Sequence, residues 1–263
     1  MHKLNLLLDR DHPGAMNMAI DQVLGEAAAA RPGEIFLRFY GWEPPTVTLG
    51  YNQPLADLNL EALDRDGIGW VRRMTGGGGV LHWNEITYAI AAPFSPAGGT
   101  SRGDLFRFCA DLLSLLYRSL GIETAARAPG PYTPFADCFA APGAYELVEV
   151  TTGKKIAGSA SALKRGYFLQ HGSLPLDDTR LRIDRYLAVS SPAPQPGGSI
   201  AIGDFVTLGR EEVLERFRAG LEDNFPVVPF RLSGEIFGAA SRLAEEKYSS
   251  PAWAHRRHSA IGA

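Results

Sequence analysis

The sequence predicts an α+β fold in which a mainly antiparallel or mixed β-sheet is flanked by helices. Most expected strands follow one another through short turns, without the regular strand–helix alternation of a doubly wound parallel sheet. Residues 102–120 form the clearest helix. Their apolar stripe includes Leu105 and Leu116, and Gly121 follows as a stop signal. A chain of 263 residues is long enough to bury a large core.

The part of the chain before this helix is expected to hold strands and two helices. Runs of apolar, β-branched and aromatic residues predict the strands, and a helical stripe predicts the first helix. Arg31-Pro32-Gly33 ends that helix, and Gly67 closes the second. The expected order is strand 3–8, helix 14–30, strands 34–41 and 46–50, helix 55–66, and strands 68–73 and 80–92.

The rest of the chain begins with an irregular, proline-rich segment and continues with a three-stranded meander. A Pro/Gly/Ser-rich loop then precedes a helical C-terminal part, and we expect residues 1–263 to form a single domain. The expected segments are the irregular piece 126–143, strands 145–150, 155–160 and 167–174, the loop 190–200, and the part 201–263 with helices 210–224 and 233–248.

The composition argues against nucleic-acid and membrane partners. Lys and Arg number 26, Asp and Glu number 29, and the net charge of -3 lacks the basic footprint of a nucleic-acid binder. No apolar run reaches the ~18 residues that a membrane span needs. Charged residues at 9–11 interrupt the N-terminal apolar run, so we expect no secretory signal, a cytoplasmic location and free thiols at Cys109 and Cys138.

Residues 72–82 read RRMTGGGGVLH and predict a loop that lies close to a ligand. Consecutive glycines expose backbone N–H groups that bind carbonyl or anionic oxygens, and Arg72 and Arg73 add positive charge. The loop lacks the Gly-Lys-Ser/Thr ending of a phosphate-binding loop, and a strand follows where a dinucleotide fingerprint has a helix. The alternative is a flexible hairpin loop that binds nothing.

Two further motifs hold candidate site residues. Residues 153–160 read GKKIAGSA, and Lys155 begins a strand whose small residues leave room for a ligand against the sheet. A solvated turn with two surface lysines is the alternative. Residues 168–174 read FLQHGSL, where a His-Gly pair indicates a close backbone approach. Taken alone, His171 is better explained as a hydrogen-bonded structural histidine.

Cys138 is the candidate nucleophile. It lies in the irregular proline-rich segment, and loops on a rigid scaffold are where catalytic groups concentrate. A small buried side chain under a loop is the alternative. Cys109 has the helical spacing of a core residue. Zinc-type ligand spacing and a Gly-x-Ser-x-Gly elbow are both absent from the sequence, so we expect no metal site, while a Ser-His-Asp triad stays open.

The order of these motifs resembles the lipoate-protein ligase A, octanoyltransferase and biotin ligase superfamily over nearly the whole chain. The matching pieces are RRMTGGG at 72–78, CF at 138–139, GKKIAGSA at 153–160, LQHGSL at 169–174, NMAID at 17–21, PTVTLGY at 45–51, and Lys247-Tyr248, Trp253 and Arg256-Arg257 near the C-terminus. CFAAP at 138–142, followed by YEL, is similar to the cysteine loop of octanoyl-acyl carrier protein:protein octanoyltransferases.

This resemblance implies a biotin/lipoate ligase-type catalytic domain and an acyltransferase of protein lipoylation. Cys138 would accept an octanoyl group from octanoyl-acyl carrier protein, with Lys155 favouring its thiolate. A lysine of a lipoyl-domain protein, such as the glycine cleavage H protein or a 2-oxo acid dehydrogenase subunit, would then take it. No ATP and no other cofactor is expected. The implied substrate-binding residues are Arg72, Arg73, Gly76, Gly77, Gly78, Gly79, His82, Gly158, Ser159, Ala160, His171 and Gly172.

Three alternatives stay open. Gly78 stands where many transferases of the superfamily carry Arg, which favours an ATP-dependent lipoate-protein ligase using ATP and Mg²⁺. Amidotransfer of an octanoyl or lipoyl group between lipoyl domains would also use Cys138. A non-catalytic acyl-binding module is disfavoured because Cys138 and Lys155 occur together. Trp83 and Ser161 depart from the superfamily's common acidic residue and glutamine.

Overall fold

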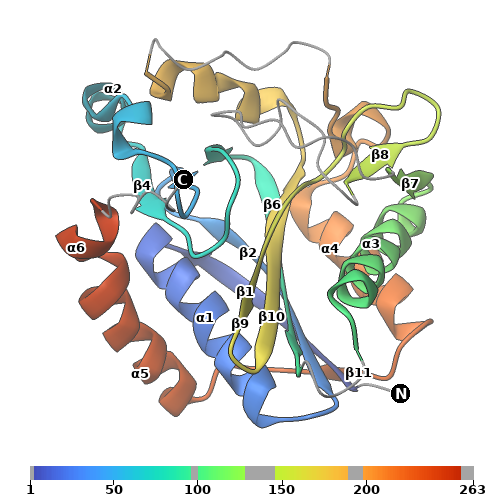
Figure 1. Cartoon of the computed structure of the whole chain (residues 1–263). Helices are drawn as coiled ribbons and strands as arrows, with labels where there is room; N and C mark the ends of the chain where they lie inside the picture. The colour runs from blue at the N-terminus through green and yellow to red at the C-terminus, as the bar shows by residue number, and fades with distance from the viewer. Residues whose placement is uncertain (1–2, 96–99, 128–145, 189–197, 256–263) are drawn as a thin grey trace, which may run out of the picture.

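The computed structural model describes residues 3–95, 100–127, 146–188 and 198–255, built around a six-stranded sheet (Figure 1). The strand order is β11-β1-β2-β6-β10-β9. β1 (Lys3–His12) has two parallel neighbours, β11 (Val227–Pro229) and β2 (Glu34–Trp42). The pairs that continue the sheet are antiparallel and involve β6 (Glu85–Pro93), β10 (Tyr167–Pro175) and β9 (Gly158–Lys164). The predicted α+β class with a mixed sheet is therefore confirmed.

Helices cover both faces of this sheet (Figure 1). The helical segments are α1 (Gly14–Ala30), η1 (Leu55–Asp57), α2 (Leu60–Arg65), α3 (Arg102–Ser119), η3 (Asp178–Tyr186), η4 (Ile202–Asp204), α4 (Arg210–Glu222), α5 (Gly234–Leu243), η5 (Ala244–Tyr248) and α6 (Pro251–Ala254). Side chains alternate along β2, so Leu37 and Phe39 pack with α3 and α4 while Phe36 packs with α1 and α5. None of the helices described has the length and apolar character needed to cross a membrane.

A smaller sheet carries the glycine-rich motif. β3 (Thr46–Leu49) pairs in parallel with β4 (Gly69–Arg72) and antiparallel with β5 (Val80–His82), and the glycines connect β4 to β5. The prediction of one strand over 80–92 is wrong. The chain turns at Asn84, whose φ of 50° is a left-handed conformation that asparagine tolerates. β5 therefore belongs to the small sheet and β6 to the main one.

The predicted three-stranded meander is also wrong. β8 (Leu147–Glu149) pairs with β7 (Thr124–Ala126), and only β9 and β10 form the expected hairpin. Lys155 lies outside the named strands, in isolated bridges to Val148 and Ser199, and β9 begins later, at Gly158. The bridge to Ser199 joins segments that are distant in the sequence, which is why a reading based on neighbouring turns missed it.

The helix boundaries differ at two places. The predicted helix at 55–66 is divided into η1 and α2, because Asn59 caps the second segment by accepting from the backbone N–H of Ala62. The predicted helix at 233–248 changes to a π-helical turn after α5. α5 and η5 nevertheless pack together on α1, so the C-terminal part shares a core with the main sheet.

Candidate active site

A narrow pocket lies between the main sheet and the small sheet. Its empty space is about 320 Å³, including the open mouth. The walls come from α1, from β2, β6, β9 and β10 of the main sheet, and from β3 and β5 of the small sheet. Among the residues proposed from the sequence, those on the wall are Arg73, His82, Gly158, Ser159, Ala160, His171 and Gly172.

Glycine at position 172 lets β9 and β10 approach closely beside the pocket. A Cβ atom on Gly172 would lie 1.9 Å from the carbonyl oxygen of Gly158 and 2.8 Å from the ring of Tyr88. Only a residue without a side chain fits there. The Tyr88 hydroxyl also lies 2.7 Å from Ser159 Oγ, and this hydrogen bond fixes the side chain of Ser159 on the pocket wall.

The glycine-rich loop is held in place by Arg73. Its guanidinium donates to the carbonyl oxygens of Gly76 at 2.6 Å and Gly78 at 2.7 Å. Gly77 has φ 92°, and its carbonyl oxygen lies where a Cβ atom on Gly50 would be, at 1.8 Å. The loop therefore folds back on the end of β3. Gly79, the last of the four glycines, leads directly into β5.

Arg72 has a different environment from Arg73. Its guanidinium is buried and donates to the carbonyl oxygens of Gly50 at 2.8 Å and Gln53 at 2.5 Å. It also donates to the carbonyl oxygen of Ala254, at 3.0 Å, in α6. Trp253 returns a hydrogen bond from its indole Nε1 to the backbone oxygen of Arg72. These contacts connect the chain around β3 and β4 with the C-terminal helix.

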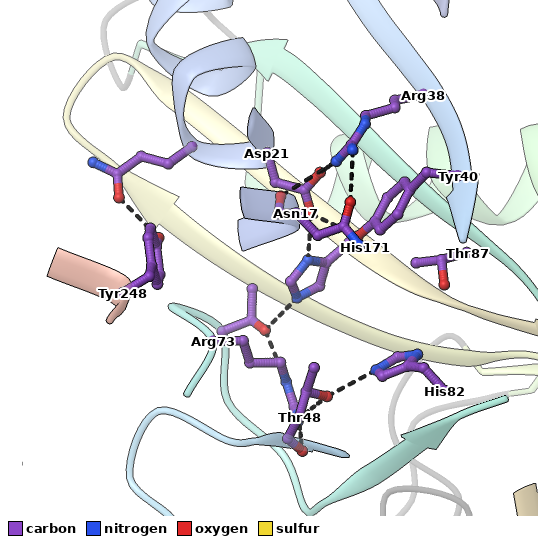
Figure 2. Close-up of polar contacts among 12 residues, drawn as sticks. Asn17, Asp21, Arg38, Tyr40, Thr48, Arg73, His82, Thr87, His171 and Tyr248 are labelled. Carbon is purple, nitrogen blue, oxygen red and sulfur yellow. Dashed lines mark hydrogen bonds and ion pairs between the residues drawn. The ribbon is translucent and has the colours of Figure 1, made fainter. Parts of the chain in front are cut away.

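His171 lies in a buried hydrogen-bond network (Figure 2). Its Nδ1 is 2.9 Å from Asp21 Oδ2, and its Nε2 is 2.7 Å from Thr75 Oγ1. Asp21 also accepts from Arg38 at 2.8 Å and from the Tyr40 hydroxyl at 2.8 Å. Burial lowers the pKa of His171, against the opposing effect of the Asp21 carboxylate, so the ring is neutral near pH 7.

Burial also raises the pKa of Tyr40 well above its ordinary value, and the Asp21 carboxylate adds to this effect. The Tyr40 phenol is therefore a hydrogen-bond donor throughout the neutral range. Because it donates to Asp21, the polar end of this wall residue is satisfied within the protein. Its ring contributes carbon surface to the pocket.

A second network surrounds His82. Its Nε2 lies 2.9 Å from Thr48 Oγ1, and its Nδ1 lies 2.7 Å from Glu85 Oε1. The ring of Trp42 stacks on the imidazole with centroids 4.2 Å apart and an interplanar angle of 19°. Arg73 Nη1 reaches Thr48 Oγ1 at 3.1 Å and Nε reaches Thr75 Oγ1 at 3.1 Å, so it connects the two networks.

Lys155 forms a buried ion pair just ahead of β9. Its Nζ is 2.5 Å from Glu146 Oε1, and the two side chains are 4% and 9% exposed. The second oxygen, Glu146 Oε2, is buried without a hydrogen-bond partner among the described residues. Cys138 lies outside the described residues, so its proximity to Lys155 stays a prediction. Cys109 is buried in α3, where burial raises the pKa of its thiol far above the ordinary range.

Several wall residues are not among those proposed from the sequence. Met18, Tyr40, Trp42, Thr87 and Ser173 line the pocket alongside the proposed residues. An apolar pattern alone does not separate a residue that faces a cavity from one that faces a core. Charged or polar residues at buried strand positions are the signal that could have found this network, since such groups need partners.

The fold is that of lipoate-protein ligases. A crystal structure of lipoate-protein ligase A bound with ATP superposes with a TM-score of 0.78 at 24% identity, covering 97% of this chain and 99% of that one. A putative lipoate protein ligase from T. acidophilum with bound lipoic acid gives a TM-score of 0.77 at 22% identity, covering 97% and 100%. At these identities the likeness establishes the architecture alone.

The chain belongs to the lipoyl protein ligase A/B catalytic domain family, whose pattern matches residues 13–217. Among curated relatives, octanoyltransferase LipM of Geobacillus kaustophilus is 35% identical, over 93% of this chain and 95% of its own length. Octanoyltransferase LipM of Bacillus subtilis is 33% identical over 92% and 94%. The predicted resemblance to this family is confirmed.

Proposed function

We propose that this protein is an octanoyltransferase that moves an octanoyl group from acyl carrier protein to a lysine of a lipoyl-domain protein. The main support is the similarity to relatives named octanoyltransferase over more than nine-tenths of the chain. The narrow pocket also supports the proposal, since seven of the residues that the resemblance implies for substrate binding lie on its wall.

The pocket would hold the acyl chain through carbon surface. Met18, Tyr40, Trp42 and Val80 contribute apolar atoms to its wall. Burial of each methylene contributes about 0.8 kcal/mol, so the methylenes of an octanoyl group contribute roughly 5 kcal/mol. Binding of this size discriminates chain lengths only where the slot is closed at its end.

In the proposed reaction, the Cys138 thiolate attacks the thioester carbonyl of octanoyl-acyl carrier protein. The bond to the carrier's thiol breaks, and the octanoyl group remains on Cys138 as a thioester. The amine of the acceptor lysine then attacks this thioester, a C–N bond forms, and the Cys138 thiolate leaves. Transfer from thioester to amide is downhill, so the reaction consumes no ATP.

Lys155 activates the nucleophile in this proposal. Its ammonium favours the thiolate of Cys138, since a neighbouring positive charge lowers a thiol pKa. Its ion pair with Glu146 holds the ammonium in position. Backbone N–H groups near Gly158 to Ala160, or in the glycine-rich loop, are the candidates for holding the oxyanion. We place this reaction in the cytoplasm, with glycine cleavage H protein and 2-oxo acid dehydrogenase subunits as acceptors.

Intact-mass measurement after incubation with octanoyl-acyl carrier protein tests the proposal. We expect an added octanoyl group on the wild type, and its absence in Cys138→Ala. Cys109→Ala is the matched control, because Cys109 is buried in α3, and it should keep the adduct. Full turnover by Cys138→Ala would show that this cysteine carries no acyl intermediate.

An ATP-dependent lipoate-protein ligase is the second candidate, favoured by Gly78 in the glycine-rich loop. It predicts pyrophosphate release from ATP and free lipoate, and the lack of release would dispose of it. Amidotransfer between lipoyl domains is distinguished by the donor. Octanoylated glycine cleavage H protein would then form the Cys138 adduct faster than octanoyl-acyl carrier protein does.

A further inference from the structure

Glu85 is a buried carboxylate at the junction of the two sheets. It is the first residue of β6 and is only 5% exposed. Its Oε1 accepts from His82 Nδ1 at 2.7 Å and from the Thr87 hydroxyl, and its Oε2 accepts from the Ser173 hydroxyl. Both carboxylate oxygens are therefore occupied by side chains of the protein.

All three partners of this carboxylate line the pocket. His82, Thr87 and Ser173 belong to three different strands, β5, β6 and β10, and each presents a wall atom to the cavity. Glu85 itself is not part of the wall. One side chain thus fixes the orientation of wall residues on two sheets.

The influence of Glu85 extends to the largest aromatic side chain of the wall. Trp42 donates from Nε1 to Thr87 Oγ1 at 2.7 Å, and its ring stacks on His82. Thr87 and His82, which both contact the indole, are therefore both bound to Glu85. A change at this carboxylate would free the indole to take another position.

These contacts explain how polar residues can form a slot for an acyl chain. Buried donors are costly when they lack acceptors, and here the hydroxyl and imidazole donors point at Glu85 and away from the cavity. The indole N–H is likewise satisfied by Thr87. What is left to face the ligand is mostly carbon, in a fixed shape.

We propose that Glu85 is a positioning residue that determines which acyl chains the pocket accepts, although it lies behind the wall. This inference rests on the proposed function, because it takes the pocket to be the acyl site. In a pocket with fixed walls, one or two extra methylenes are excluded by contact. Loosened walls accept longer chains, and unpaired donors accept polar chain ends.

Glu85→Gln is the variant of choice, because it keeps the size of the side chain. A carboxamide supplies one acceptor oxygen, and its NH₂ group faces donors that formerly met a carboxylate oxygen. A hydroxyl such as that of Ser173 can accept from the NH₂ group only by directing its own proton to another acceptor, which changes the polar surface of the wall. Glu235→Gln is the matched control, since Glu235 is exposed in the first turn of α5.

The measurement is a competition among hexanoyl-, octanoyl-, decanoyl- and 8-hydroxyoctanoyl-acyl carrier protein, with the products counted by mass. Ratios of products are independent of how much enzyme is folded, so a purely structural role of Glu85 would not change them. A methylene in a fixed pocket discriminates about 10- to 200-fold. We expect the octanoyl-to-decanoyl ratio to fall at least tenfold in Glu85→Gln, and the 8-hydroxyoctanoyl share to rise. Unchanged ratios would overturn the inference.

Two further arms keep the test decisive. Should Glu85→Gln fail to fold, Ser173→Ala and Thr87→Val remove its contacts one at a time, and unchanged ratios in both would overturn the inference.

Calorimetric binding of octanoate and decanoate to wild type and Glu85→Gln separates the two proposals. If the wild type binds octanoate selectively, the variant loses that selectivity, and neither transfers an acyl group, the role of Glu85 is supported and the proposed transferase activity is refuted. If both proteins transfer octanoyl groups with the same selectivity, the transferase activity is supported and the role of Glu85 is refuted.

Discussion

Replacement of Asp21 by asparagine tests whether the His171 network is a structural support of the pocket. Asp21 is 1% exposed and accepts from three donors, Arg38, Tyr40 and His171. Asparagine has the same shape but one acceptor oxygen and no charge. Its NH₂ group must therefore face a donor, and the buried guanidinium loses one of its carboxylate partners.

The structure sets the expected magnitude. Removal of one partner of a buried ion pair costs about 3–5 kcal/mol. Asp9, whose Oδ2 lies 2.9 Å from Arg38, remains as a second carboxylate, which places the loss near the lower end, at about 3 kcal/mol. In a chain of this size, 1 kcal/mol corresponds to roughly 2–4 °C in melting temperature, so we expect a decrease of about 6–12 °C.

Calorimetry and urea unfolding of Asp21→Asn provide the assay. Asp111→Asn is the control, because Asp111 is exposed on α3, and it should change the unfolding free energy by less than about 0.5 kcal/mol. A loss below about 1 kcal/mol in Asp21→Asn would refute the reasoning, since it would mean that Arg38, Tyr40 and His171 find equal partners elsewhere.

Three more outcomes are expected. Gly172→Ala should abolish octanoyl transfer and destabilise by about 1–3 kcal/mol, because its Cβ would meet the backbone oxygen of Gly158; wild-type behaviour in activity and melting would contradict this. Because the folded-state pKa of His171 is depressed by burial, its contribution to stability is present above pH 6.5 and lost as the pH falls below it. Urea unfolding of His171→Asn at several pH values should show a shallower acid decline than the wild type, and equal slopes would exclude it. Glu146→Gln should cost about 3–5 kcal/mol by leaving the buried Lys155 without its carboxylate. Adding Lys155→Met should restore part of that loss, and a double variant no more stable than Glu146→Gln would argue against the pair.

The sequence predicts the regular elements well where burial repeats with a simple period. The helix expected at 102–120 ends at Ser119, and the strand expected at 34–41 ends at Trp42. In α3 the spacing of apolar side chains records which side faces the core, whereas β2 is buried on both faces and is recognised by its run of strand-forming residues.

Strand pairing between segments that are far apart in the sequence cannot be predicted from such a local pattern. Lys155 bridges to Ser199, and β1 takes a parallel neighbour from residues 227–229, which no local turn signal announces. The left-handed turn at Asn84 divides a continuous run of strand-forming residues. These features depend on contacts between distant segments, and a propensity window does not contain them.

The residues of the candidate site also fall into two groups, those that the sequence predicts and those that it does not. The motifs indicate Arg73, His82 and His171 because their sequence context is unusual, and all three lie on the pocket wall. Tyr40 and Trp42 occupy ordinary positions in a strand that is buried on both faces, so their burial does not tell that they face a cavity. The proposed participation of Cys138 still rests on the resemblance, and the mass measurement decides it.

The hydrogen bonds around Arg72 connect α6 to the chain that lies beside the glycine-rich loop. Removal of residues 251–263 would take away the Ala254 carbonyl and the Trp253 indole, leaving a buried guanidinium short of an acceptor beside the turn at Gly50. That turn lies directly against Gly77. A chain shortened in this way would carry a disturbed glycine-rich loop, so a purification tag is better attached at the N-terminus than put in place of α6.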